Sequence, residues 1–181
     1  MPDQIKVVDK LGLDRILTRI SHEILEKNKG SENLVLMGMR TRGEFLAARI
    51  AKKIKQIDEI ELPLGILDVT LYRDDFRTSL KQPQVSVSNI TFDINGKDII
   101  LIDDVLFTGR TVRSALNALM DFGRPASIQL FILIDRGHRE LPIRADYVGK
   151  NIPTSVYQEI KVKMEEIDGK DGIYLIELNK K

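Results

Sequence analysis

The stretch 98–122 constrains the fold most, because its pattern changes twice along its length. Residues 99–102 read Ile-Ile-Leu-Ile, which is typical of a strand buried on both faces of a parallel sheet. Residues 103–111 are mostly polar and predict a turn. From Thr111 onward the apolar residues recur at helical spacing, so a helix is expected to follow.

The turn between this strand and this helix has the properties of an anion site. Backbone N–H groups at a helix N-terminus, together with the helix dipole, favour negative charge. Gly109 allows a ligand to approach the backbone closely, and Thr108 and Thr111 add hydroxyl groups. Asp103 and Asp104 oppose a phosphate by charge, but carboxylates accept hydrogen bonds well from a vicinal diol. The pattern therefore predicts a sugar phosphate, and a divalent metal carried by a pyrophosphate would reduce the repulsion.

A second loop of the same kind lies between a strand predicted over 34–38 and a helix predicted over 44–57. It nearly matches the P-loop of nucleoside triphosphatases, but Glu44 replaces the required Lys, so we reject that interpretation. Cations are unfavourable at a helix N-terminus. We therefore predict a pyrophosphate site rather than a solvated loop, formed by Arg40, Thr41, Arg42 and Gly43.

The remaining chain predicts an α/β fold with a mainly parallel sheet and a small antiparallel part. An amphipathic helix is expected over 13–28, with Asp9 or Asp14 at its start, and strands are expected over 64–72 and 127–134. Residues 157–166 and 172–178 predict a closing antiparallel hairpin. Residues 73–90 are long, polar and without periodicity, so we expect a lid over the site.

Length and composition narrow the class of protein. With 181 residues, the chain predicts one domain over 1–181. It has no cysteine, which excludes disulfide scaffolds and thiolate metal sites and fits a reducing compartment. No apolar run approaches the ~20 residues that span a bilayer, and no signal-peptide core is visible, so we expect a cytoplasmic protein without a membrane partner. Its net charge of +1 restricts any nucleic-acid surface to a local patch.

Residues 99–111, Ile-Ile-Leu-Ile-Asp-Asp-Val-x-x-Thr-Gly-x-Thr, resemble the phosphoribosyl-pyrophosphate (PRPP) motif of type I phosphoribosyltransferases. The resemblance extends along the chain to the PyrR family, bacterial attenuation regulators of the pyrimidine operon that are also uracil phosphoribosyltransferases. The segments that carry it are 17–23, 41–43, 70–75, 135–146 and 151–155. The implied reaction joins uracil to PRPP, with Mg²⁺ bound through PRPP near Asp103 and Asp104, and gives UMP and diphosphate.

The resemblance also implies roles for individual residues. Asp103 and Asp104 would hold the ribose diol, and Arg42 would bind the pyrophosphate with Arg40, Thr41 and Gly43. Arg73 and the loop after it would cover the site, and Arg136 would lie near the base. The 5′-phosphate would be held by Val105, Leu106, Phe107, Thr108, Gly109, Arg110 and Thr111. Expected catalytic residues are Asp103, Asp104, Arg42 and Arg73.

Two positions depart from the family's relatives. Purine-specific relatives carry Asp immediately before the Thr-Gly pair, where this chain has Phe107, which argues for a pyrimidine substrate. Arg40 stands where a Lys is expected, and its geometry is not equivalent. The alternative is a type I transferase for another base, such as hypoxanthine, without RNA regulation.

The regulatory role implied by the resemblance is binding of pyrimidine-operon leader mRNA when UMP or UTP occupies the site, which promotes transcription termination. Cations on phosphates and polar side chains around loop bases would serve it. The expected RNA-binding residues are Thr18, Arg19, His22, Arg139, Arg144 and Lys150, although solvated surface remains an alternative for those of helix 13–28. The resemblance further implies a homodimer or homotetramer.

Overall fold

A five-stranded parallel sheet forms the centre of the computed structural model, which describes residues 4–69 and 88–178. Its strand order is β3-β2-β4-β5-β6, and each pair of neighbours is parallel. The strands are β2 (Leu34–Met39), β3 (Leu64–Leu67), β4 (Asp98–Leu106), β5 (Ser127–Asp135) and β6 (Tyr147–Asn151). This arrangement confirms the predicted α/β class and places β4 in the middle of the sheet.

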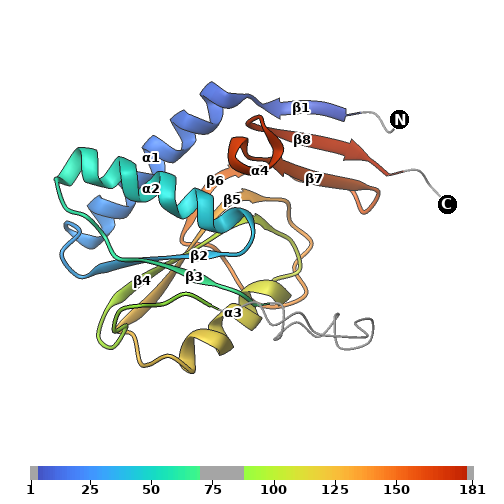
Figure 1. Cartoon of the computed structure of the whole chain (residues 1–181). Coiled ribbons are helices and arrows are strands. Elements are labelled where there is room, and N and C mark those ends of the chain that lie inside the picture. Colours follow the sequence, from blue (N-terminus) through green and yellow to red (C-terminus); the bar gives the residue numbers. More distant parts are fainter. Residues whose placement is uncertain (1–3, 70–87, 179–181) are drawn as a thin grey trace.

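Helices cover both faces of this sheet (Figure 1). α1 (Lys10–Asn28) and α2 (Arg42–Asp58) lie on one face, and α3 (Arg110–Met120) lies on the other. Each face has its own apolar core, one with Phe131 under α1 and α2, the other with Leu119 of α3. α1 begins where Asp9 accepts a hydrogen bond from the Gly12 N–H at 2.7 Å, which is the capping role proposed for that residue.

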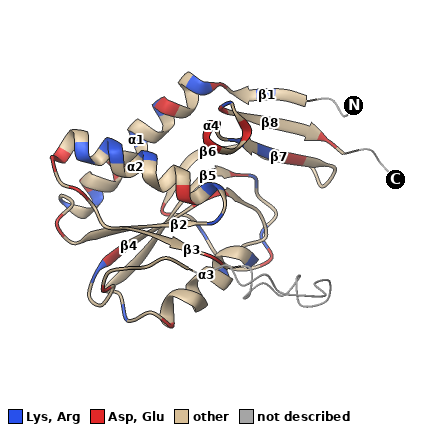
Figure 2. Cartoon of the chain, in the orientation of Figure 1, with Lys and Arg blue, Asp and Glu red and all other residues tan. Residues whose placement is uncertain are grey.

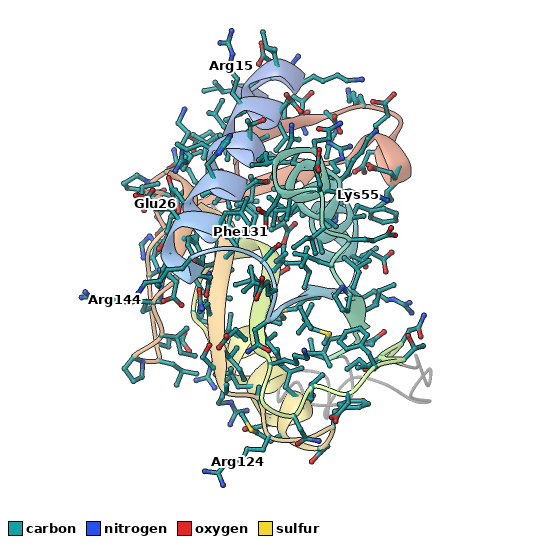
Figure 3. The ribbon with its side chains drawn as sticks, turned by 90° about the vertical axis from the view of Figure 1, so that its left-hand side faces the viewer. Arg15, Glu26, Lys55, Arg124, Phe131 and Arg144 are labelled. Atoms are coloured by element: carbon teal, nitrogen blue, oxygen red, sulfur yellow. The ribbon has the colours of Figure 1, made fainter. Side chains whose placement is uncertain are left out.

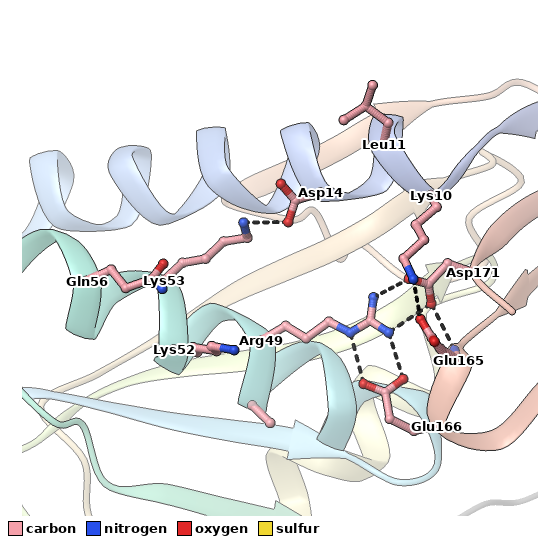
Figure 4. A pocket seen from close by; sticks show the side chains of 11 residues that line it. Lys10, Leu11, Asp14, Arg49, Lys52, Lys53, Gln56, Glu165, Glu166 and Asp171 are labelled. Atoms are coloured by element: carbon pink, nitrogen blue, oxygen red, sulfur yellow. Dashed lines mark hydrogen bonds and ion pairs between the residues drawn. The ribbon is translucent and has the colours of Figure 1, made fainter. Parts of the chain in front are cut away.

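A small antiparallel sheet of order β1-β8-β7 stands at one end of the molecule and forms a hood (Figure 1). It consists of β1 (Gln4–Val8), β7 (Gln158–Lys163) and β8 (Gly172–Glu177), with the short helix α4 (Glu165–Asp168) between the last two. Arg49 of α2 ties the hood to the main sheet. It donates to both oxygens of Glu166 at 2.9 and 2.7 Å and to both oxygens of Asp171 at 2.9 and 2.8 Å (Figure 4).

Several predicted boundaries were wrong. β4 continues through residues 103–106, which were predicted as turn, because hydrogen bonds to β5 persist as far as Leu106. β3 ends at Leu67 rather than at 72, and the hairpin strand predicted to reach 166 ends at Lys163, where α4 follows. β1 and β6 were not predicted at all. Arg73 and most of the lid expected over 73–90 lie outside the described residues. Only 88–90 of that segment are described, and there Asn89 forms a β-bridge with Ile66.

The two cores allow a test with a matched pair of phenylalanines. Phe131 is completely buried under α1 and α2, whereas Phe122 is 44% exposed (Figure 3). We expect Phe131→Ala to lower the free energy of unfolding by about 3–5 kcal/mol, because it leaves a cavity. Phe122→Ala should cost less than about 1 kcal/mol. Urea unfolding of both variants measures the difference, and equal losses would contradict this packing.

Candidate functional site

The C-terminal half of β4 carries the two carboxylates singled out in the sequence. Asp103 and Asp104 lie within the strand, between β2 and β5, at the carboxyl end of the parallel sheet where ligands bind in open α/β folds. Asp103 accepts a hydrogen bond from the Asp104 N–H at 2.9 Å, and Asp104 accepts one from the Val105 N–H at 2.9 Å. The carboxylates are thus fixed by backbone amides of their own strand.

Asp104 is in an environment that disfavours its charged form. Burial raises the pKa of the Asp104 carboxyl above its usual value, and the nearby positive charge of Arg42 offsets this only in part. A cation or a hydroxyl donor brought by a ligand would stabilise the charged form further. The site is therefore suited to a ligand that presents hydroxyl groups, a metal ion, or both.

An anion cradle follows β4 directly. Gly109 has φ of 91°, a left-handed conformation that favours glycine, and it forms the N-cap of α3 without a side-chain cap. The Arg110 guanidinium lies beside this cradle and pairs with Glu140 at 2.7 Å. A cavity of about 360 Å³ opens here, lined by Asp103, Val105, Leu106, Phe107, Thr108, Gly109, Arg110, Thr111, Val112 and Glu140. The structure thus gathers the residues predicted to hold a phosphate around one cavity.

The loop between β2 and α2 lies against β4 because of a glycine. A Cβ on Gly43 would come within 2.4 Å of the Ile102 carbonyl oxygen, so only glycine permits this approach. The loop contains a cis peptide bond between Arg40 and Thr41. It places Arg42 close enough to Asp104 to influence its charge, and so brings the predicted pyrophosphate loop to the carboxylate pair.

The two arginines of this loop have different partners. Arg42 lies 3.3 Å from Asp168 of α4, and its Nε is buried without a hydrogen-bond partner among the described residues. Arg40 lies 3.5 Å from Glu44 and 3.8 Å from Asp68, so it turns toward the end of β3. Arg42 is therefore the loop cation that faces the carboxylates, and Asp168 is a partner that no local sequence motif indicated.

Phe107 and Arg136 form the side of the site where a base was expected. The Arg136 guanidinium lies 4.1 Å from the centre of the Phe107 ring, which is 39% exposed. Arg136 itself is buried and donates to the Thr154 hydroxyl at 3.0 Å and to the Gln158 carbonyl at 2.6 Å. Burial lowers the pKa of Arg136. This ring and guanidinium present a flat surface held in place from the hood.

The residues predicted to bind RNA do not all come together. Arg19 of α1 donates to the Val148 and Gly149 carbonyls at 3.2 and 2.6 Å, which brings it beside Lys150 of β6. His22 and Arg144 are exposed, and Arg144 projects from the loop before β6 (Figure 3). Thr18 turns toward α2, where it accepts a hydrogen bond from Lys53 at 2.8 Å.

Arg139 lies elsewhere, next to the cavity that follows β4. It donates to the Ile143 and Phe107 carbonyls, each at 3.0 Å, and pairs with Asp135. These contacts engage its guanidinium in holding the loop under Phe107. Sequence reasoning also missed Thr154, Gln158 and Glu140, whose roles arise from contacts between distant segments.

Residues 4–69 and 88–178 contain no group of three or more His, Cys, Asp or Glu side chains placed to hold a metal ion. None of the described helices combines the length and apolar character that crossing a membrane requires.

Comparison with known proteins identifies the family. The model of the phosphoribosyl transferase domain matches residues 7–167. Proteins named bifunctional protein PyrR are 56% identical in Pelotomaculum thermopropionicum, with 97% of each chain covered, and 53% identical in Listeria monocytogenes, covering 99% of this chain and all of the relative. The chain belongs to the PyrR family of phosphoribosyl transferase proteins.

Solved structures support the fold of this PyrR-family chain. Hypoxanthine phosphoribosyltransferase of Staphylococcus aureus has a TM-score of 0.69 at 22% identity, covering 97% of this chain and 92% of that one. The enzyme of Trypanosoma cruzi has a TM-score of 0.72 at 16% identity, covering 96% and 97%. Such low identity shows the shared fold alone. The predicted PyrR relationship is confirmed, and purine transferases are only distant relatives.

The half-buried carboxyl group of Asp104 predicts how the stability of the fold changes with pH. Because its pKa is raised in the folded chain, the folded state binds this proton more tightly than the unfolded state does. The contribution of Asp104 to the free energy of unfolding therefore falls as the pH rises from about 4, the unfolded value. Asp104→Asn should raise Tm at pH 7, by about 2–4 °C for each kcal/mol recovered, and the gain should shrink toward pH 4.

Thermal unfolding of the variant and the wild type between pH 4 and pH 8 checks this expectation. The quantity compared is the difference between the two Tm values at each pH, so that the contributions of the other carboxylates, which both proteins share, cancel. A lower Tm for the variant at pH 7 would show that attraction to Arg42 outweighs the cost of burial.

Proposed function

We propose that this chain transfers the phosphoribosyl group of PRPP to uracil, giving UMP and diphosphate, and that the nucleotide-bound protein binds pyrimidine-operon leader mRNA. Membership of the PyrR family supports both activities. The observation that carries the enzymatic part is the adjacent pair of the buried Asp103 and the half-buried Asp104, directly before the anion cradle at the start of α3. A carboxylate pair for a diol beside amide donors for a phosphate suits a ribose 5-phosphate.

The roles of the site residues follow from their placement. Asp103 and Asp104 would accept hydrogen bonds from the ribose hydroxyls, while residues 105–111 hold the 5′-phosphate. Arg42 would leave Asp168 to bind the pyrophosphate, with Arg40, Thr41 and Gly43 forming the rest of that loop. Arg73 and the lid remain predictions, because they lie outside the described residues.

Mg²⁺ would enter as part of the substrate, bound to the pyrophosphate of PRPP. The oxygens of Asp103 and Asp104 are ligands of the kind that Mg²⁺ prefers, directly or through water. The ion would neutralise charge on the leaving pyrophosphate. The two carboxylates alone form a small ligand set, which fits a metal brought by the substrate.

Catalysis would rest on positioning and charge rather than on a protein nucleophile. Substitution at the C1 of a sugar passes through a state with oxocarbenium character, and the leaving pyrophosphate gains negative charge. Arg42 is placed to stabilise that charge, and the diol grip of the aspartates orients the ribose relative to the base.

The base would lie against Phe107 and Arg136. An apolar ring suits a flat pyrimidine, and the position lacks the Asp that purine-using relatives carry before the Thr-Gly pair. The buried guanidinium of Arg136 packs on this ring, 4.1 Å from its centre. These features disfavour the alternative of a hypoxanthine transferase.

RNA binding would depend on what occupies the same cavity. A nucleotide changes RNA affinity only by its different affinities for the RNA-bound and RNA-free states, and the coupling is reciprocal. Arg19 and Lys150 lie together on one surface, with His22 and Arg144 exposed and available. A regulator of nascent transcripts would work in the cytoplasm, and we expect a homodimer or homotetramer, as the family resemblance implied.

The enzymatic proposal predicts UMP formation from labelled uracil and PRPP with Mg²⁺. Asp104→Asn should lower kcat/KM by about 10²–10³-fold, because the grip on the diol and on the metal-bound substrate weakens. Glu32→Gln, the same change at an exposed position, is the control. A panel of bases should give product with uracil and none with hypoxanthine. Full activity of Asp104→Asn would refute the role of the pair.

The regulatory proposal predicts that UMP increases affinity for a leader hairpin. Arg144→Gln should weaken this binding and lower the slope of log K against log salt by about 1, because one phosphate contact is lost. UMP formation should be kept. Filter binding with and without UMP at several salt concentrations measures both effects. If UMP leaves the RNA affinity unchanged, the regulatory proposal fails.

A further inference from the structure

A basic groove lies between β1, the first turns of α1 and β6. We define the basic groove by Lys6, Arg15, Arg19 and Lys150, and its lining also includes Asp9 and Gly149. It encloses about 620 Å³. Arg15 and Lys6 were not among the residues that the sequence marked for any role. Arg15 projects from the start of α1 into solvent (Figure 3).

The charge of this groove is not balanced. Its lining has four cations and one carboxylate, and that carboxylate, Asp9, already caps α1 by accepting from the Gly12 N–H at 2.7 Å. Within residues 4–69 and 88–178, no acidic side chain lies within ion-pair distance of Lys6, Arg15 or Lys150. Arg19 pairs with Glu23 at 2.5 Å, so the positive charge that is free to act on a ligand is that of Lys6, Arg15 and Lys150.

A second groove of this chain shows the opposite arrangement. It lies between α1, α2 and the hood, encloses about 900 Å³, and is lined by four cations and four carboxylates (Figure 4). Most of these charges are paired within the groove, as in Lys10–Glu165 at 2.5 Å and Lys53–Asp14 at 2.6 Å. This second groove is therefore electrically balanced, whereas the basic groove is not. Figure 2 shows basic residues on α1 near β1.

The basic groove is held in shape by the contact between α1 and β6. A Cβ on Gly149 would come within 2.4 Å of the Leu133 carbonyl oxygen and 2.9 Å of Ile16, so glycine lets β6 lie close to α1. Arg19 spans this contact by donating to Val148 and Gly149. The guanidinium of Arg19 is thereby held beside β6, at the two residues that precede Lys150 in the chain. This fixed position lowers the entropic cost of binding an anion at Arg19.

We propose that the basic groove binds the phosphate backbone of the RNA, and that Lys6 and Arg15 extend the RNA surface from α1 and β6 to the first strand of the hood. This inference rests on the proposed RNA-binding function and deepens it. A concave groove that holds three cations without an acidic partner among the described residues, beside the Arg19–Glu23 pair, suits the regularly spaced charges of a nucleic-acid backbone. Continuity with Arg19 and Lys150, already expected to contact RNA, favours RNA over an acidic protein.

The test is the salt dependence of RNA affinity for the double variant Lys6→Gln, Arg15→Gln in the full chain. Both residues are exposed, so the fold should persist. Each lost phosphate contact lowers the slope of log K against log salt by about 0.7–0.9, and the double variant should therefore lose about 1.5. Its affinity for the leader hairpin at 50 mM salt should fall at least tenfold. UMP formation and the enhancement of RNA binding by UMP should remain.

The matched control is Lys52→Gln, Lys55→Gln, which removes the same charge from exposed positions of α2. It should keep the wild-type slope to within about 0.3. Equal losses in both double variants would assign the effect to net charge and overturn the inference alone, as would an unchanged Lys6/Arg15 variant. If the wild-type chain binds no leader RNA with UMP present, the proposed regulatory function and this inference fall together.

Discussion

The site depends on one constraint, the placement of two adjacent carboxylates, Asp103 buried and Asp104 half-buried, in the middle of the sheet. β4 can carry Asp103 and Asp104 there because their own backbone amides satisfy part of their hydrogen-bonding capacity and Arg42 supplies a positive charge. Without a ligand, holding the charged Asp104 in this environment costs free energy, because the environment disfavours its charged form. A ribose with its metal-bound pyrophosphate would relieve that cost, so the same feature that weakens the fold prepares the site for its substrate.

The hood links this site to the rest of the molecule. Asp168 of α4 pairs with Arg42, and the Gln158 carbonyl at the start of β7 accepts a hydrogen bond from Arg136. Both arginines of the site are thus in contact with the hood. The hood also contains β1, which lies beside the basic groove. The hood therefore contacts both the site that follows β4 and the proposed RNA surface. Whether both sites shift one equilibrium is a question of differential affinity, not of distance.

Glycines determine how closely the elements approach one another. Gly43 brings the cationic loop to β4, where a Cβ would meet the Ile102 carbonyl oxygen at 2.4 Å. Gly149 lets β6 lie against both β5 and α1, because a Cβ there would meet the Leu133 carbonyl oxygen at 2.4 Å and the Ile16 side chain at 2.9 Å. The first approach brings the cationic loop to the carboxylates, and the second helps to shape the basic groove. Both proposed functions thus depend on close contacts that a larger side chain would prevent.

The sequence by itself determined the parallel sheet, its main helices, and the phosphate and carboxylate residues, because these depend on local periodicity and on one contiguous motif. It did not determine β1 or β6, since short strands with mixed composition become strands only through their neighbours. Only the tertiary structure decided that Arg139 packs beneath Phe107, that Asp168 holds Arg42, and that Lys6 joins Arg15 in one groove. Those outcomes come from contacts between residues far apart in the chain, whose free energies no local pattern contains.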